Sequence, residues 1–71
     1  MRKGYIIFFT TSCAFFSEEK LKEQGLNIKL VPTPREFSSD CGISIYFEVD
    51  HKGNIESILN QYQIEFEIKT I

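Results

Sequence analysis

The chain has 71 residues, which is enough for one domain but lies near the lower limit for a single hydrophobic core. A domain of this size buries only about 60% of the surface of its unfolded chain, which argues against a deep substrate cavity. Its composition, 42% hydrophobic and 25% charged residues with a net charge of −2, is globular and disfavours non-specific binding to nucleic acid or to an anionic membrane.

The sequence has neither a membrane-spanning segment nor an export signal of the usual length. No apolar run approaches the ~20 residues that span a bilayer. The apolar run 5–9 is followed by Thr10-Thr11-Ser12, so it is shorter than the ~7–15 residues of an export signal. We therefore expect a cytoplasmic protein without membrane association, in which two reduced cysteines form no structural disulfide.

The first predicted element is a strand over Tyr5–Thr10, rich in β-branched and aromatic residues. Both of its faces are apolar, with Tyr5, Ile7 and Phe9 on one side and Ile6 and Phe8 on the other. This pattern is typical of a central strand that is covered on both sides.

A helix is predicted next, over Ser12–Gln24, after the possible N-caps Thr10, Thr11 and Ser12. The residues expected to face the sheet are Ala14, Ser17, Leu21 and either Phe15 or Phe16. Gly25 suits the left-handed residue after a helix, followed by Leu26 in contact with Leu21.

Three further patterns complete the chain. Alternation predicts strands over Asn27–Val31, Ile43–Val49 and Ile64–Lys69, and helical spacing predicts a helix over Asn54–Tyr62. Pro32 and Pro34 end the second strand and indicate an edge position, because proline cannot donate to a ladder. The order β-α-β-β-α-β predicts an α+β, ferredoxin-like sandwich: an antiparallel sheet of order 4-1-3-2 with two helices on one face.

This topology gathers the two cysteines at one end of the sheet. Cys13 lies in the first turn of the first helix, and Cys41 precedes the third strand in the segment Val31–Gly42. A helix N-terminus and Arg35 favour a thiolate, whereas Asp40 opposes it. Each cysteine also has a simpler interpretation as a small packed hydrophobe, and Ser38-Ser39-Asp40 is common turn chemistry.

Other catalytic patterns are missing from the sequence. His51, the only histidine, is expected at the opposite end of the third strand from Cys41, so the two cannot form a catalytic pair within one subunit. Two cysteines and one histidine at these spacings match no zinc motif, and we find no phosphate-binding loop. We therefore expect no metal, no cofactor and no self-sufficient enzyme.

The sequence resembles the selenium/sulfur carrier-like family of small domains over essentially its whole length. The most specific part is Leu30-Val31-Pro32-Thr33-Pro34-Arg35 followed by Ser38-Ser39 and Cys41-Gly42; Leu21-Lys22-Glu23-Gln24-Gly25 and Ile64-Glu65-Phe66-Glu67 support it. The resemblance implies that Cys41 carries sulfur or selenium. The neighbouring residues Pro32, Thr33, Pro34, Arg35, Ser38, Ser39 and Gly42 are then the expected binding segment.

The implied mechanism is a persulfide or selenopersulfide on Cys41, loaded by a donor protein and passed to an acceptor protein. Cys13 is not part of the family pattern, and its possible role as a resolving thiol comes from the topology alone.

Two competing functions remain open. One is a regulatory or assembly module that forms a homodimer through the open sheet face, where either Ile6 and Phe8 or Tyr5, Ile7 and Phe9 would be exposed. The other is an RNA-binding module, with Tyr46 and one face of the first strand stacking bases. The acidic charge and the lack of a basic, doubly aromatic third strand argue against RNA binding, so we expect no nucleic acid partner.

Overall fold

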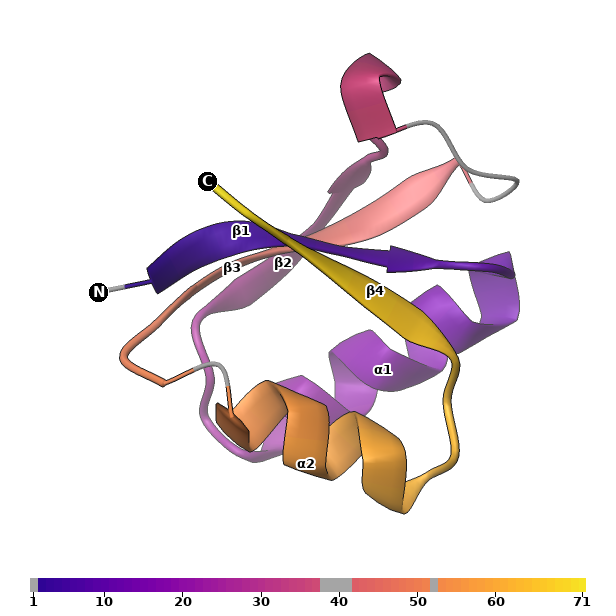
Figure 1. Ribbon diagram of the computed structural model, residues 1–71. Helices are drawn as coiled ribbons and strands as arrows, with labels where there is room; N and C mark the ends of the chain where they lie inside the picture. The colour runs from indigo at the N-terminus through magenta and orange to yellow at the C-terminus, as the bar shows by residue number, and fades with distance from the viewer. Residues whose placement is uncertain (1, 38–41, 52) are drawn as a thin grey trace.

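The computed structural model describes residues 2–37, 42–51 and 53–71, and Figure 1 shows the arrangement. The elements in chain order are β1 (Arg2–Phe8), α1 (Thr11–Glu23), β2 (Ile28–Pro32), the short 3-10 helix η1 (Arg35–Phe37), β3 (Ile43–Val49), α2 (Gly53–Gln61) and β4 (Phe66–Thr70). The strands form one sheet of order β2-β3-β1-β4, in which all neighbours are antiparallel. Counted from β4, this order reads 4-1-3-2.

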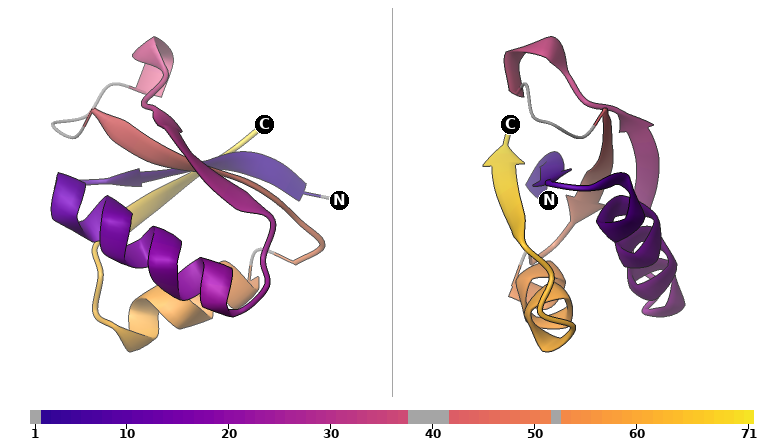
Figure 2. Two further views of the ribbon diagram at one scale, coloured as in Figure 1. Left: turned by 180° about the vertical axis from the view of Figure 1, so that it is seen from behind. Right: turned by 90° about the vertical axis from the view of Figure 1, so that its right-hand side faces the viewer.

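Both helices lie on one face of the sheet (Figure 2). The predicted α+β class, with a four-stranded antiparallel sheet and two helices, is confirmed. The boundaries differ most in β1, which begins at Arg2 rather than Tyr5 and ends at Phe8 rather than Thr10. Thr10 is not part of the strand because it is the N-cap of α1, where its Oγ1 accepts the backbone N–H of Cys13 at 3.2 Å.

The core lies between the sheet and the helices. β1 and β3 contribute Ile6, Phe8, Ile45 and Phe47, all fully buried, and the helices contribute Ala14, Leu21, Ile55 and Leu59. Each strand gives alternate residues to this face, as the period of two requires. The helix face of the sheet therefore holds Ile6 and Phe8, and the open face holds Tyr5 and Ile7.

One expectation about α1 is wrong. Ala14, Ser17 and Leu21 are buried as predicted, but Phe15 and Phe16 are 49% and 39% exposed, so neither packs against the sheet. The buried residues follow a spacing of three and four, which leaves positions 15 and 16 beside the buried stripe. Phe16 instead packs edge-to-face on Tyr62, with ring centroids 5.2 Å apart.

Both helices end in the same hydrogen-bonded motif. After α1, the N–H of Gly25 donates to Lys22 and that of Leu26 donates to Leu21. After α2, the N–H of Gln63 donates to Asn60 and that of Ile64 donates to Leu59. These are Schellman bonds, which require a left-handed residue after the helix. Gly25 has φ of +76°, and Gln63 takes the same role with φ of +57°.

The left-handed backbone at these two positions predicts that removing glycine lowers stability and that introducing glycine raises it. We expect Gly25→Ala to lower the free energy of unfolding by about 1 kcal/mol, because a Cβ disfavours the left-handed conformation. We expect Gln63→Gly to raise it by up to about 1 kcal/mol for the same reason. Urea denaturation measures both, and Gly53→Ala is the control, because Gly53 is the first residue of the helix α2, where no left-handed residue is required. Equal effects at residues 25 and 53 would contradict the prediction.

Candidate functional site

The candidate site is the loop between β2 and β3, and its base is held by hydrogen bonds. The backbone N–H of Thr33 donates to the carbonyl of Gly42 at 3.0 Å. The hydroxyls of Thr33 and Ser44 are 2.7 Å apart, and Ser44 is fully buried. The chain is therefore joined at Thr33 and Gly42, at the edge of the sheet. Ser38, Ser39, Asp40 and Cys41 lie outside the described residues, so their predicted roles stay predictions.

Pro32 lies at the one kind of strand position that tolerates proline. The Thr33–Gly42 bond and the bond from Glu48 to Asn27 show that odd-numbered residues of β2 bond to β3. The backbone groups of Pro32 therefore point to the outer side of the sheet, so its missing N–H breaks no ladder bond. The predicted edge position of this strand is confirmed.

The first half of the loop folds over the open face of the sheet. The carbonyl of Pro34 accepts the N–H of Phe37 at 3.0 Å, which closes the single turn of η1. The ring of Phe37 then lies 5.6 Å from the ring of Tyr5, while Arg35 is exposed. Sequence reasoning missed η1 and the Phe37 contact, because three residues between prolines and serines give no periodic signal.

Gly42, the residue that follows Cys41, is exposed and has open space around it. A Cβ built at this position would meet no described residue within 4 Å apart from its chain neighbours. An open, apolar hollow lies beside it, lined by Leu30, Val31, Pro32, Gly42 and Ile43. The surface at Gly42, the residue after Cys41 in the sequence, thus offers apolar contact area.

Cys13 is the third residue of α1. It is half-buried and packs against the core. Ile7 of β1 pairs with Ser44 of β3, so the end of β1, the start of α1 and the start of β3 lie at the same end of the sheet. The prediction that these elements lie together at one end of the sheet is confirmed for the described residues. Proximity of Cys13 to Cys41 stays a prediction.

His51 follows the other end of β3, seven strand residues away from Gly42. At about 3.4 Å per residue, β3 separates the two by more than 20 Å. Over residues 2–37, 42–51 and 53–71 there is no group of three or more His, Cys, Asp or Glu side chains that could hold a metal ion.

The open face is more covered than the sequence suggested. Ile7 is only 5% exposed, and Tyr5 contacts both Phe37 and Tyr46, at 5.6 and 5.4 Å between ring centroids. The aromatic rings proposed for base stacking therefore pack against one another. Among the described residues, five large hydrophobic side chains are exposed: Phe9, Phe15, Phe16, Tyr62 and Ile71.

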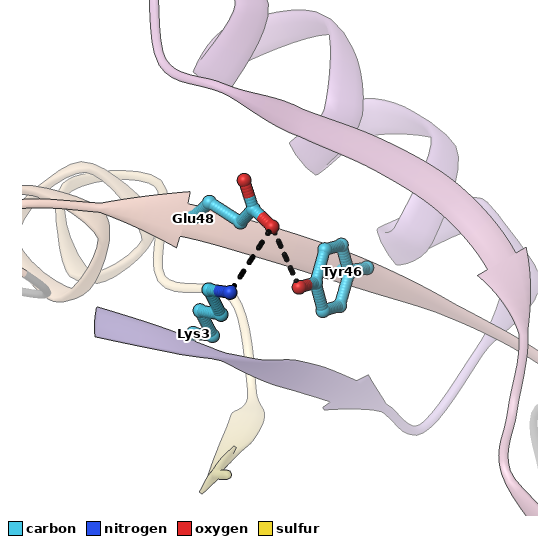
Figure 3. A network of polar contacts seen from close by, with 3 residues as sticks. All are labelled: Lys3, Tyr46 and Glu48. Carbon is cyan, nitrogen blue, oxygen red and sulfur yellow. Dashed lines mark hydrogen bonds and ion pairs between the residues drawn. The ribbon is translucent and has the colours of Figure 1, made fainter. Parts of the chain in front are cut away.

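A polar network continues this face away from the loop (Figure 3). The Tyr46 hydroxyl donates to Glu48 Oε1 at 2.9 Å, and the ammonium of Lys3 lies 4.0 Å from the same oxygen. The hydrogen bond to Glu48, together with burial and the nearby Glu48 charge, raises the pKa of Tyr46 above 10.0.

The comparisons with known proteins gave one match. A family model described as "Putative Se/S carrier protein-like" matches residues 3–69. Neither the curated proteins nor the solved structures contain a match. Of the helices that the structure describes, none is both long and apolar enough to cross a membrane.

The Thr33–Ser44 contact predicts a measurable effect on stability. Thr33→Val keeps the shape of the side chain but removes its hydroxyl, which deprives the buried Ser44 hydroxyl of this partner. We expect the free energy of unfolding to fall by about 1–2 kcal/mol. In the double variant Thr33→Val/Ser44→Ala, which removes both hydroxyls, the loss should be smaller than the sum of the single losses. Strict additivity in urea denaturation would contradict the contact.

The Tyr46–Glu48 bond predicts a pH effect. A raised pKa in the folded state means that the stabilisation by Tyr46 is fully present below about pH 10 and is lost as the pH rises through the folded-state pKa. We expect Glu48→Gln to lower the pKa of Tyr46, because the carboxylate charge is lost. Tyrosinate absorbance measures this pKa in a Tyr5→Phe/Tyr62→Phe background, where Tyr46 is the only remaining tyrosine. An unchanged pKa would show that Glu48 is not the cause.

Proposed function

Because the chain belongs to the Se/S carrier protein-like family, we propose that it carries sulfur or selenium on the thiol of Cys41. The observation that supports this most is the family match over residues 3–69, which includes the whole β2–β3 loop. The loop base adds a structural argument, since Thr33 fixes the chain at Gly42, the residue directly after Cys41. A thiol on an anchored loop is suited to repeated docking with other proteins.

The transfer needs no oxidant and no cofactor. The Cys41 thiolate attacks the outer sulfur of a donor persulfide, R–S–SH. The donor S–S bond breaks, R–S⁻ leaves, and Cys41–S–SH forms. An acceptor thiolate then attacks the outer sulfur in the same way, and the Cys41 thiolate is released. With a donor selenopersulfide, the outer atom is selenium and the electron count is the same.

The partners are a donor protein and an acceptor protein that each present a thiol or persulfide. Both must approach the same loop, so we propose that they use the described surface around it. Pro32 and Gly42 line the apolar hollow, and Arg35 is exposed on η1. A guanidinium near the loop would also favour an anionic persulfide.

Cys13 has a secondary part in this proposal, as a resolving thiol. Its thiolate would attack the inner sulfur of Cys41–S–SH, which forms a Cys13–Cys41 disulfide and releases HS⁻. A dithiol reductant would then have to restore both thiols. Since Cys13 is half-buried, we expect this step to be slower than transfer to an acceptor.

The test is loading by a small-molecule persulfide donor, followed by intact-mass measurement. We expect the wild-type chain to gain a sulfur atom that dithiothreitol removes, and Cys41→Ser to gain none. Cys13→Ser is the matched control and should load as well as the wild type, but hold its cargo longer if Cys13 resolves it.

Loading that persists in Cys41→Ser and disappears in Cys13→Ser would overturn the assignment. Failure of both cysteines to load would favour the alternative, a regulatory or assembly module without a carrier thiol.

A further inference from the structure

The outer edge of β4 has no strand beside it in the described part of the chain. The sheet order is β2-β3-β1-β4, so β4 is paired only with β1. Figure 2 shows β4, in yellow, at the margin of the sheet. An unpaired edge presents a row of backbone donors and acceptors that can add another strand.

The register shows which backbone groups face outward. The N–H of Ile71 donates to the carbonyl of Lys3 at 2.9 Å, so Lys3 and Ile71 form a hydrogen-bonded pair. The pattern alternates along an antiparallel ladder, so Lys69 and Glu67 also bond to β1. Phe66, Ile68 and Thr70 therefore direct their N–H and carbonyl groups away from β1. None of the three is a proline, so each offers both a donor and an acceptor.

The other edge strand, β2, does not offer a backbone donor at every outward position. On β2 the outward residues are Ile28, Leu30 and Pro32, and the proline offers no donor. Proline on an edge strand is one of the devices that prevent unwanted strand pairing. Of the two edges, β4 is therefore the one suited to strand addition.

The sequence of β4 is complementary to itself. If two copies of β4 pair antiparallel about Ile68, residue 67 of one copy lies opposite residue 69 of the other. This places Glu67 opposite Lys69 twice, on the open face. These would be non-hydrogen-bonded pairs, in which the Cα atoms are only about 4.5 Å apart and the side chains are closest. We propose that β4 pairs with β4 of a second copy, so that two sheets join into one.

The side chains of the described structure fit this arrangement. Within one chain Lys69 Nζ already lies 2.7 Å from Glu67 Oε1, so the paired strands would carry four charges of alternating sign. On the helix face, Phe66 and Ile68 pack against the core but are only partly buried. Pairing would bring Ile68 against its own copy and Phe66 against Thr70, which covers their exposed remainder.

The joined sheet would place the two β2 strands at its outer edges. Its strand order would run β2-β3-β1-β4 in one copy and then β4-β1-β3-β2 in the other. The ends of the β2–β3 loop, at Thr33 and Gly42, would lie toward the outer side of the joined sheet, whereas η1 reaches back over the open face, where Phe37 contacts Tyr5, the partner of Lys69 in the β1–β4 pair. This dimer does not depend on the carrier function, and it uses a different surface from the open-face dimer expected from the sequence.

Sedimentation velocity over a wide range of protein concentration tests the proposal. We expect the wild type to dimerise, and Lys69→Glu to raise the dimer dissociation constant by about tenfold or more, because both cross-strand pairs become Glu–Glu. The matched control is the exchange Glu67→Lys/Lys69→Glu. It has the same composition as the wild type and restores both opposite-charge pairs, so it should dimerise like the wild type.

A wild type that stays monomeric at every concentration would overturn the proposal. So would a dimer that Lys69→Glu leaves unchanged, because the interface would then lie on another face. If the exchange variant stays monomeric while its circular dichroism shows the native fold, the charge complementarity is wrong as well.

Discussion

The pairing of β1 with β3 is the constraint on which the rest of the molecule depends. These two strands form the centre of the sheet, and their six-residue register places Ile6 and Phe8 of β1 beside Ile45 and Phe47 of β3 on one face. A shift of either strand by one residue would turn its two core side chains away from the helices. The same register brings the start of β3 next to the end of β1. The start of α1 and the end of the candidate loop therefore lie at the same end of the sheet.

Strong periodicity made most of the fold predictable. The third strand was predicted with its observed bounds, because Ile43, Ile45, Phe47 and Val49 alternate without a break. Gly25 marked the end of α1, since a left-handed residue is needed there. Pro32 marked an edge strand, because a proline in an inner strand would lose a ladder bond. Each of these signals comes from the local chemistry of the backbone or from a simple repeat.

What was not predictable depends on contacts between residues far apart in the chain. Ser44 alternates like a solvent-facing residue, yet it is fully buried with its hydroxyl on Thr33. Ile7 belonged to one of the two strand faces expected as the exposed one, yet it is buried, and its neighbour Tyr5 packs on Phe37 and Tyr46. Phe15 and Phe16 were equally suited to the core by hydrophobicity, but α1 turns Ala14, Ser17 and Leu21 to the core and leaves both rings outside it. Cys41 itself lies outside the described residues, so the structure describes only the chain on either side of it, up to Phe37 and from Gly42.

The architecture separates two requirements that would conflict in so small a domain. A carrier thiol must be reached by one partner and then by another, so the surface around it cannot be permanently covered. Exposed strand edges, however, tend to become covered. In this protein the edge nearest the loop contains Pro32, which discourages pairing, whereas the self-complementary edge lies at the other side of the sheet, on β4. The proposed lasting interface at β4 and the base of the β2–β3 loop would therefore lie at opposite edges of the same sheet.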